Sequence, residues 1–305
     1  MRAVVFGGSG FLGSHVADAL ADAGHEVTIY DITPSPYLRQ DQTMVVGDIM
    51  DQQLVEKTTA AHDVVYHMAG IADIDECIYR PVDTVKFNIM GTVIILEASK
   101  KTGVKRFVFA SSAYVYSAAG YFYRSSKQAS EAFIENYNEL FGLPYTILRY
   151  GSLYGERADK NNSIFKILTQ ALSEGKITYR GTGDEFREFI HVKDAATNSV
   201  KILDPEFENK NVIITGVQQM KYRDLLEMIR EMMGNKVEIE ILPSERIAHY
   251  RLTPYNFAPK LGKKLVANPH IDIGQGLLAL LAEIYERLHT EKHETMGLFV
   301  DENGK

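Results

Sequence analysis

Short apolar runs recur along the first half of the chain, and longer stretches with a helical spacing of apolar residues separate them. The runs are continuous hydrophobic segments, which is typical of parallel strands buried on both faces. Six such strands are predicted, at residues 3–6, 27–30, 44–46, 63–69, 106–110 and 145–149. Amphipathic helices between them are predicted at 54–60, 82–101 and 123–141. This alternation predicts an α/β fold built on a doubly wound parallel sheet.

Polar and small residues are common at the carboxyl ends of these strands or directly after them. Such positions are held by Asp31, Asp48, Met68, Ala69, Gly70, Ser111, Ser112 and Tyr150. Ligands of doubly wound sheets bind at the carboxyl ends of the strands. The order of the chain therefore predicts that these residues share one rim of the sheet and form a binding site there.

The first strand runs into a glycine-rich turn that opens a helix. The turn contains Gly7, Gly10 and Gly13, and the second strand ends in Asp31. Glycines at this point let backbone N–H groups approach a pyrophosphate at the helix N-terminus. Asp31 would accept hydrogen bonds from the adenosine ribose hydroxyls, and its charge would repel a 2′-phosphate. The pattern predicts a dinucleotide site that prefers NAD to NADP.

A candidate proton-transfer group follows the fifth strand. Ser111 and Ser112 stand just beyond the apolar run, and Tyr123 and Lys127 lie four residues apart on one helix face. A neighbouring ammonium favours the phenolate and would bring the pKa of the tyrosine toward neutrality. A serine hydroxyl would hold a substrate oxygen beside the phenol. Together with a hydride carrier, these groups predict an oxidoreductase type of chemistry.

The second half of the chain begins with a polar, turn-rich stretch from Gly155. A helix is predicted at 164–174, and a helix at 194–203 and a strand at 212–215 are expected to return to the first sheet. Segments at 221–233, 237–242 and 273–287 would build a smaller α/β domain. The predicted cofactor domain is thus 1–153 plus about 188–215, and the substrate domain is 154–187 plus about 216–290. A polar tail at 291–305 is expected beyond them.

Composition narrows the class of protein. The chain has 305 residues and a net charge of −7, which argues against a nucleic-acid-binding protein. Its single cysteine, Cys77, excludes an internal disulfide framework and fits a reducing compartment. No apolar run approaches the ~18 residues of a membrane span. We expect a cytoplasmic enzyme with neither nucleic acid nor membrane as a partner, and no metal site is predicted.

The chain resembles the extended short-chain dehydrogenase/reductase superfamily, and within it the NAD-dependent nucleotide-sugar epimerases and dehydratases of the UDP-glucose 4-epimerase type. The matching motifs are GGSGFLG, the YD of the second strand, GDI, HMAG, NIMGTVIILEA, FASSAYVY, YRSSK and ILRYGSLYG. They follow the family's order through about the first half of the chain. The resemblance implies a Rossmann-type fold, NAD as cofactor, a UDP- or GDP-sugar as substrate, and a homodimer formed through the helices at 82–101 and 123–141.

The resemblance also implies roles for individual residues. Ser112 would hold the substrate hydroxyl, Tyr123 would be the general base and acid, and Lys127 would hold the nicotinamide ribose and lower the pKa of the tyrosine. Cofactor contacts are implied at Gly7, Gly10, Phe11, Leu12, Gly13, Asp31, Asp48, Ile49, Met68, Ala69, Gly70, Asn88, Ser111, Tyr123, Lys127, Tyr150 and Ser152. Substrate contacts are implied at Ser112, Tyr123, Ser152, Ser163 and Arg187.

Arg187 would bind the diphosphate of the nucleotide sugar, because a guanidinium makes two-point contacts with phosphate. The alternative is a surface arginine paired with Asp184 or Glu188, since exposed ion pairs are common. Two further positions depart from the family pattern. Ser152 and Ser163 stand where asparagines are usual, which suggests a substrate other than the common UDP-hexoses.

The residues after Ser112 distinguish the reactions of the superfamily. Dehydratases of this kind carry Asp-Glu there, whereas this chain has Ala113 and Tyr114. The pattern favours a 4-epimerase that works through a transient 4-keto sugar. An oxidoreductase, or a dehydratase, acting on a nucleotide sugar or another carbonyl is the alternative, and a non-catalytic dinucleotide sensor is a third. The loop at 117–122 is shorter than in the family, which predicts a wider pocket beside Tyr123.

Overall fold

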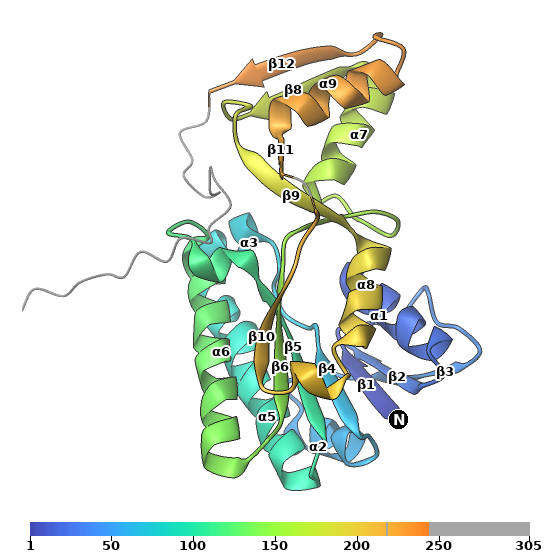
Figure 1. Cartoon of the computed structure of the whole chain (residues 1–305), viewed down its shortest axis with the longest axis vertical. Coiled ribbons are helices and arrows are strands. Elements are labelled where there is room, and N and C mark those ends of the chain that lie inside the picture. Colours follow the sequence, from blue (N-terminus) through green and yellow to red (C-terminus); the bar gives the residue numbers. More distant parts are fainter. Residues whose placement is uncertain (218, 244–305) are drawn as a thin grey trace, which may run out of the picture. The chain divides into compact units, whose positions relative to one another are not determined.

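A seven-stranded parallel sheet is the largest element of the computed structural model, which describes residues 1–217 and 219–243 (Figure 1). The strand order is β10-β6-β5-β4-β1-β2-β3, and every neighbouring pair is parallel. The strands are β1 (Arg2–Phe6), β2 (Glu26–Asp31), β3 (Gln42–Val46), β4 (Val64–His67), β5 (Arg106–Ser112), β6 (Tyr145–Tyr150) and β10 (Lys210–Ile214). The chain winds outward from β1 in both directions, so the predicted doubly wound sheet is confirmed.

Helices cover both faces of this sheet because both faces of its strands are apolar. On β1, Ala3 and Val5 pack into one core and Val4 and Phe6 into the other, since successive side chains of a strand point to opposite faces. Figure 1 shows α1 and α8 on one side of the sheet and α2, α5 and α6 on the other. These helices are α1 (Phe11–Asp22), α2 (Gln52–Ala60), α5 (Gly91–Thr102), α6 (Tyr121–Phe141) and α8 (Val192–Lys201).

The helix expected at 82–101 is not regular. It consists of α4 (Pro81–Thr84), a π-helical turn (Val85–Met90) and α5. Such turns often occur at functional sites. The short helix α3 (Ile74–Tyr79), which the sequence pattern did not predict, precedes them, and Asp73 caps it by accepting a hydrogen bond from the Glu76 N–H.

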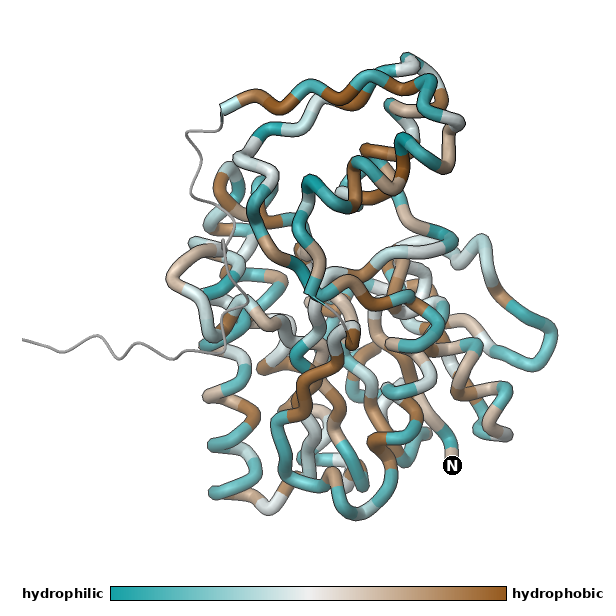
Figure 2. The backbone as a smooth tube through the Cα atoms, turned by 45° about the horizontal axis from the view of Figure 1, so that its top comes forward, coloured by the Kyte–Doolittle hydropathy of each residue, from teal (hydrophilic) through white to brown (hydrophobic). Residues whose placement is uncertain are grey.

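The second half of the chain forms smaller sheets with a hydrophobic core of their own. β8 (Lys176–Arg180) pairs with β12 (Glu238–Leu242), which alternates between hydrophobic and hydrophilic positions in Figure 2. The helices α7 (Ser163–Glu174) and α9 (Tyr222–Met232) pack with these strands. A three-stranded sheet has the order β11 (Gln219–Lys221), β9 (Phe186–His191), β7 (Ser152–Tyr154). The remaining short helices are Ala113–Tyr116 and Pro205–Phe207, both 3₁₀.

The predicted secondary structure of this second half can be compared as far as residue 243. The expected elements at 164–174, 221–233 and 237–242 coincide with α7, α9 and β12 within two residues at each end. β10 lies in the seven-stranded sheet beside β6. The helix expected at 273–287 and the tail at 291–305 lie outside the described residues, and the predicted domain boundaries remain a prediction.

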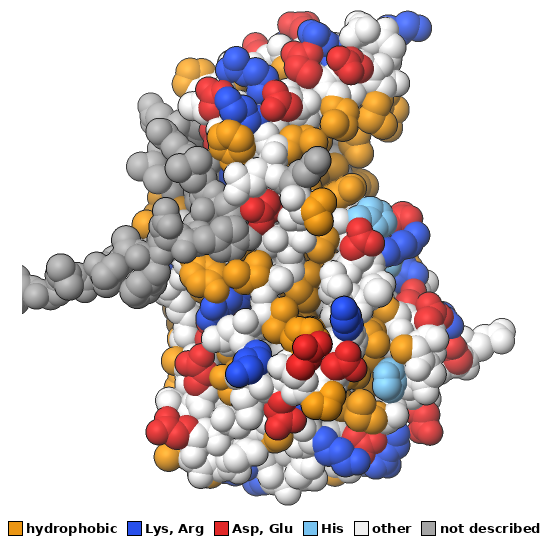
Figure 3. Space-filling model, in the orientation of Figure 1, with side chains coloured by type: hydrophobic (Ala, Val, Ile, Leu, Met, Phe, Trp, Pro, Cys, Tyr) orange, Lys and Arg blue, Asp and Glu red, His pale blue; other side chains and the backbone are white. Residues whose placement is uncertain are grey.

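The surface carries charges of both signs close together. Figure 3 shows Lys and Arg side chains interspersed with Asp and Glu on the face in view. Many of these groups form exposed ion pairs, such as Arg39 with Asp22 at 2.6 Å. Exposed pairs of this kind contribute little to stability, so the fold depends on its apolar cores. Within the described ranges, no helix is both long and apolar enough to cross a bilayer.

Candidate active site

A cavity of about 730 Å³ lies at the carboxyl ends of the parallel strands. Most of the predicted site residues line it, namely Gly7, Gly10, Phe11, Leu12, Gly13, Asp31, Asp48, Ile49, Met68, Ala69, Gly70, Ser111, Ser112, Tyr123, Lys127 and Tyr150. Four predicted residues are not among its lining, namely Asn88, Ser152, Ser163 and Arg187. The structure therefore brings the glycine turn and the Ser/Tyr/Lys group together at one rim.

The glycine turn approaches the segment after β4 so closely that side chains would not fit. Gly7 has a φ of +82°, and a Cβ built on it would lie 2.6 Å from the backbone nitrogen of Ala69. A Cβ on Gly13 would lie 2.9 Å from the carbonyl carbon of Gly7. This compact turn at the start of α1 leaves the helix N-terminus facing the cavity, as binding of a pyrophosphate requires.

The Asp31 carboxylate is held at the end of β2 by backbone groups. Its Oδ2 accepts a hydrogen bond from the Ser9 N–H at 3.0 Å, and its Oδ1 accepts one from the Thr33 N–H at 3.2 Å. The acid is thus fixed beside the glycine turn and lines the cavity. Turn and acid together fit the adenosine and pyrophosphate parts of a dinucleotide.

Ser112, Tyr123 and Lys127 come from two elements that meet at the cavity. Ser112 ends β5 and caps the following 3₁₀ turn, where its Oγ accepts a hydrogen bond from the Tyr114 N–H at 3.3 Å. Tyr123 and Lys127 lie one turn apart on the buried face of α6. The Lys127 ammonium donates to the Ala110 carbonyl at 2.7 Å and lies 4.7 Å from the centre of the Phe109 ring. The predicted group is therefore assembled in space, and its catalytic role remains a proposal.

Burial governs the pKa values of this group. It raises the pKa of Tyr123 to about 12, although a side-chain hydrogen bond with Ser112 opposes the shift. It lowers the pKa of Lys127 to about 8, against the opposing influence of Cys77 and Glu131. The expectation that Lys127 brings the pKa of the tyrosine toward neutrality is wrong for the protein alone. The ammonium donates to the Ala110 carbonyl, and desolvation of the phenolate is the main influence on the pKa of Tyr123.

Asn88 supports the cavity from behind instead of lining it. It is buried in the π-helical turn, where its Oδ1 accepts a hydrogen bond from the Ile71 N–H at 2.7 Å and its Nδ2 donates to the Ile71 carbonyl at 3.0 Å. The same Nδ2 donates to Ser126 Oγ at 3.0 Å on α6. Asn88 thereby fixes the loop after β4, which does line the cavity, to the helix that carries Tyr123.

Several cavity residues were missed by sequence reasoning, namely Asp73, Glu76, Arg80, Asp159, Asn161 and Asn162. Asn162 caps α7 and accepts hydrogen bonds from the Ile164 and Phe165 N–H groups at 3.0 and 3.1 Å. A pair of asparagines before an apolar helical stretch is a cap signal that could have identified it. Its neighbour Ser163, which was predicted instead, has its hydroxyl 3.4 Å from that of Tyr222.

The other two residues outside the cavity lie on the three-stranded sheet. Ser152 pairs with Phe189 at the start of β7, while its neighbours Gly151 and Leu153 line the cavity. Arg187 on β9 is only 4% exposed, so the alternative of a surface arginine is wrong. Its guanidinium donates to the Phe186 carbonyl at 2.7 Å and lies 5.5 Å from the Tyr222 ring centre. A contact of Arg187 with substrate remains a prediction.

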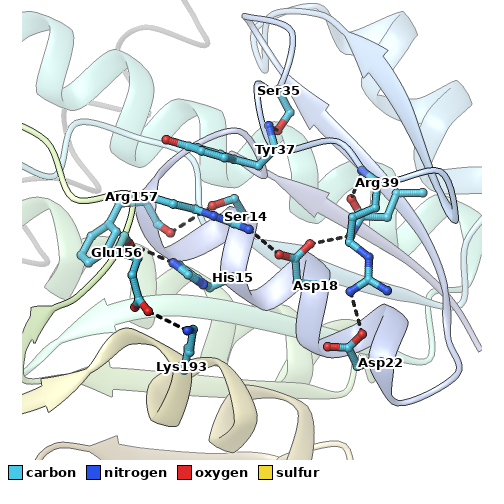
Figure 4. Close-up of polar contacts among 12 residues, drawn as sticks. Ser14, His15, Asp18, Asp22, Ser35, Tyr37, Arg39, Glu156, Arg157 and Lys193 are labelled. Carbon is cyan, nitrogen blue, oxygen red and sulfur yellow. Dashed lines mark hydrogen bonds and ion pairs between the residues drawn. The ribbon is translucent and has the colours of Figure 1, made fainter.

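The segment between β7 and the Asp159–Asn162 wall is tied to α1, as Figure 4 shows. His15 Nε2 lies 2.9 Å from the Glu156 carbonyl, and Arg157 Nη2 donates to Asp18 at 2.7 Å. The Glu156 carboxylate also accepts a hydrogen bond from Lys193 at 2.6 Å. The contacts of His15 and Asp18 hold the chain that enters the cavity wall against α1, and the contact of Lys193 ties it to α8. The described part of the chain contains no cluster of side chains suited to a metal ion.

The fold is that of a Rossmann-type α/β protein, with its ligand site at the carboxyl edge of a doubly wound sheet. Residues 3–215 match the model of the NAD dependent epimerase/dehydratase family, and the chain belongs to that family. This confirms the resemblance seen in the sequence, and NAD is the cofactor.

Relatives of the chain act on UDP-sugars, according to their names. It is 30% identical to a putative UDP-glucose 4-epimerase of Methanocaldococcus jannaschii over 90% of this chain and 95% of that protein. It is 28% identical to a UDP-N-acetyl-alpha-D-glucosaminuronate decarboxylase of Bacillus cytotoxicus over 81% of this chain and 84% of that one. The crystal structure of UDP-glucose 4-epimerase with UDP-glucose from Thermotoga maritima matches with a TM-score of 0.77 at 26% identity, over 84% of this chain and 90% of that one.

Replacing Gly13 by alanine should weaken NAD binding at least about tenfold, because the new methyl group forces α1 away from the turn that receives the pyrophosphate. Isothermal titration with NAD measures the effect. Gly24→Ala is the matched control at the other end of α1, where a Cβ has open space. Its φ of +80° should cost roughly 1 kcal/mol of stability and leave NAD affinity unchanged. Wild-type NAD affinity in Gly13→Ala would contradict the assignment of the turn.

The stability of NAD-free protein should depend on pH through Lys127. Its pKa falls from 10.5 to about 8 on folding, so below pH 8 the folded state carries the full cost of a buried ammonium. As the pH rises from about 8 to 10.5 the folded protein loses this proton first, and the free energy of unfolding rises. Between these pH values, the free energy of unfolding of the wild type should rise by on the order of 3 kcal/mol relative to that of Lys127→Met. Urea denaturation of both proteins across this pH range measures it, and a constant difference would contradict the prediction.

Proposed function

We propose that the protein is an NAD-dependent nucleotide-sugar 4-epimerase that acts on a UDP-sugar, with a GDP-sugar as the second candidate. The observation that carries the proposal is that Ser112, Tyr123 and Lys127 line the same cavity as the glycine turn. A hydride carrier and a proton-transfer group at one rim fit the oxidation and reduction of a sugar hydroxyl. Among the reactions of the family, 4-epimerisation is supported by the 4-epimerases that this chain resembles.

The three side chains have distinct tasks in this proposal. Tyr123, as the phenolate, removes the proton of the sugar hydroxyl, and Ser112 holds the same oxygen through its hydroxyl. When bound, NAD supplies the chemistry of taking up a hydride from the sugar carbon and returning it. Lys127 places a positive charge next to the reacting oxygen when it is protonated. After the keto sugar has turned over, Tyr123 returns the proton to the oxygen on the other face.

The residues after Ser112 support epimerisation over dehydration. Ala113 is 1% exposed and carries no ionisable group, and Tyr114 follows it in the 3₁₀ turn. Elimination of water from a keto sugar needs an acid and a base in addition to Tyr123. The absence of a carboxylate at these two positions therefore supports oxidation and reduction at C4, with proton transfer at the C4 hydroxyl, over elimination of water.

The short loop before Tyr123 supports a substrate that needs more space beside its sugar than a longer loop would leave. Gly120 and Tyr121 both have positive φ angles, of 94° and 41°. Arg124 closes the loop by donating to the Ser117 and Ala118 carbonyls at 3.0 and 2.6 Å. Of residues 113–122, none is among the described residues that line the cavity. Residues 113–122 therefore add no wall to the described part of the cavity on the side of Tyr123.

Incubation of the purified protein with UDP- and GDP-sugars should give interconversion of 4-epimers without accumulation of NADH. Chromatography of the sugars and the absorbance of NADH measure the two quantities. Tyr123→Phe should lower kcat about 10²- to 10⁴-fold, because it removes the general base. Tyr121→Phe is the control, since Tyr121 is exposed and lies outside the cavity.

Each other result of this assay has a definite meaning. Stoichiometric NADH would show a net oxidoreductase instead of an epimerase. Unchanged turnover in Tyr123→Phe would overturn the proton-transfer assignment. Bound NAD without turnover of any sugar would leave the non-catalytic sensor as the function.

We also propose that the protein is a homodimer, as the resemblance implies, with α6 as the interface helix. Ile94 and Leu96 of α5 are buried in the chain's own core, so they are not available to a partner. On α6, however, Phe133, Leu140 and Phe141 are 41%, 71% and 54% exposed. Large apolar side chains exposed together on one helix support an interface there.

Phe133→Glu should therefore shift the protein from dimer to monomer, because a carboxylate at an apolar interface is costly to desolvate. Light scattering after size-exclusion chromatography measures the mass. Phe165→Glu on α7 is a matched control, since Phe165 is equally exposed at 41%. A monomeric wild-type protein would contradict the proposal.

A further inference from the structure

Glu131 is a buried carboxylate for which the proposed reaction has no use. It lies on α6 four residues after Lys127 and eight after Tyr123, so the three side chains share one face of the helix. Glu131 is only 6% exposed. A buried charge is costly unless it is paired and hydrogen-bonded, so its contacts indicate what it does.

The carboxylate contacts the end of β5 and the end of β6. Ser111 Oγ donates to Glu131 Oε1 at 2.5 Å. Arg149 makes a two-point contact, from Nε to Oε1 at 3.0 Å and from Nη2 to Oε2 at 2.6 Å. Ser111 and Arg149 are themselves opposite each other in the β5–β6 register. Glu131 thus joins α6 to two adjacent strands where they reach the cavity.

The contacts continue to the far end of the turn that carries Ser112. Arg149 Nη1 hydrogen-bonds to the hydroxyl of Tyr116, and the guanidinium carbon lies 4.7 Å from the centre of that ring. Tyr116 is the last residue of the 3₁₀ turn Ala113–Tyr116, and Ser111 directly precedes Ser112. The contacts of Glu131 and Arg149 therefore hold both ends of the segment that contains Ser112.

We propose that Glu131 is a positioning residue for the reaction, which fixes the turn bearing Ser112 to the helix face bearing Tyr123 and Lys127. The inference rests on the proposed function, because it assigns these three side chains to the chemistry. A buried ion pair adds little to stability compared with apolar side chains of similar volume. Its two-point geometry does fix distances and angles, which reactions between Ser112, Tyr123 and substrate require.

Glu131 also acts on the charge of Lys127. The groups that face Lys127 are Tyr123 and Glu131 from α6, Cys77 from α3, His67 from β4, and the Ala110 carbonyl and Phe109 ring from β5. Burial lowers the pKa of His67 to about 3 and raises the pKa of Cys77, so both are neutral near pH 7. Of these groups, the Glu131 carboxylate is then the anion that favours the ammonium.

Glu131→Gln keeps the size of the side chain and removes its charge. We expect kcat to fall about 10- to 100-fold, since small misplacements of reacting groups have effects of this size. KM for the sugar should change by less than about threefold, and NAD affinity should stay at the wild-type value. Glu131 does not line the cavity, so neither the sugar nor NAD would contact it. The alkaline limb of the pH–rate profile should move to lower pH, because Lys127 loses its neighbouring anion.

Two further variants separate positioning from folding. Glu139→Gln is the matched control, since Glu139 is exposed on the same face of α6 two turns later. It should leave kcat and the pH profile unchanged. Ser111→Ala keeps the Glu131–Arg149 pair and removes the link to β5, so it should fold and lower kcat about three- to tenfold. Because Ser111 also lines the cavity, NAD affinity is measured on the same variant, and it should stay at the wild-type value. If Glu131→Gln does not fold, Ser111→Ala becomes the test of the proposal. A wild-type kcat in Ser111→Ala would overturn it.

The pKa of Lys127 gives a readout that needs no substrate. NMR of labelled lysine side chains, assigned with Lys127→Met, should show a lower pKa in Glu131→Gln and no change in Glu139→Gln. If the pKa of Lys127 and kcat were the same in the wild type, Glu131→Gln and Glu139→Gln, the proposed role of Glu131 would be overturned. The epimerase proposal would remain intact. A wild-type protein without sugar turnover would instead refute the proposed function, and the NMR comparison would still test Glu131.

Discussion

The parallel hydrogen bonding of β1, β4, β5 and β6 is the constraint on which the rest of the site depends. Parallel strands bring their carboxyl ends to one edge, so residues far apart in sequence become neighbours there. Gly7 follows β1, Met68 follows β4, Ser112 ends β5 and Tyr150 ends β6. The backbone ladders fix these positions in register, and the helices on both faces bury the strands that carry them. The glycine turn and the Ser112, Tyr123 and Lys127 side chains are adjacent because the sheet brings the elements that carry them to one edge.

Burial sets the electrostatics of this edge in a direction that the sequence alone did not indicate. Removing a phenol and an ammonium from water favours the neutral form of each, which drives the pKa of Tyr123 up and that of Lys127 down. The opposing influences are local, namely the Ser112 hydrogen bond on Tyr123, and Cys77 and Glu131 on Lys127. Spacing on a helix shows that Tyr123 and Lys127 are neighbours, but it cannot show how far each is desolvated or where the ammonium points.

Sequence patterns therefore predicted the features that are determined by neighbouring residues in the chain. The apolar strands, the glycine turn and the YxxxK helix face could be identified because periodicity and turn residues determine them. The π-helical turn at Asn88 could not, because it depends on contacts with Ile71 and Ser126, which are 17 and 38 residues away. Arg187 illustrates the same limit: its residue type suits phosphate binding, but its burial against Tyr222 is a property of the tertiary structure.

The short loop and the Glu131 contacts constrain the same pair of elements from opposite ends. The loop must reach from Tyr116 to Tyr123 in few residues, which it does by placing Gly120 and Tyr121 at positive φ. Backbone in this region is strained for a tyrosine, and surrounding contacts must hold it there. Because Arg149 fixes Tyr116 and Glu131 fixes the helix beyond Tyr123, α6 cannot move without moving the turn that carries Ser112. In this chain the contacts of Glu131 and the short loop therefore link the same two elements, namely the turn that carries Ser112 and the helix that carries Tyr123.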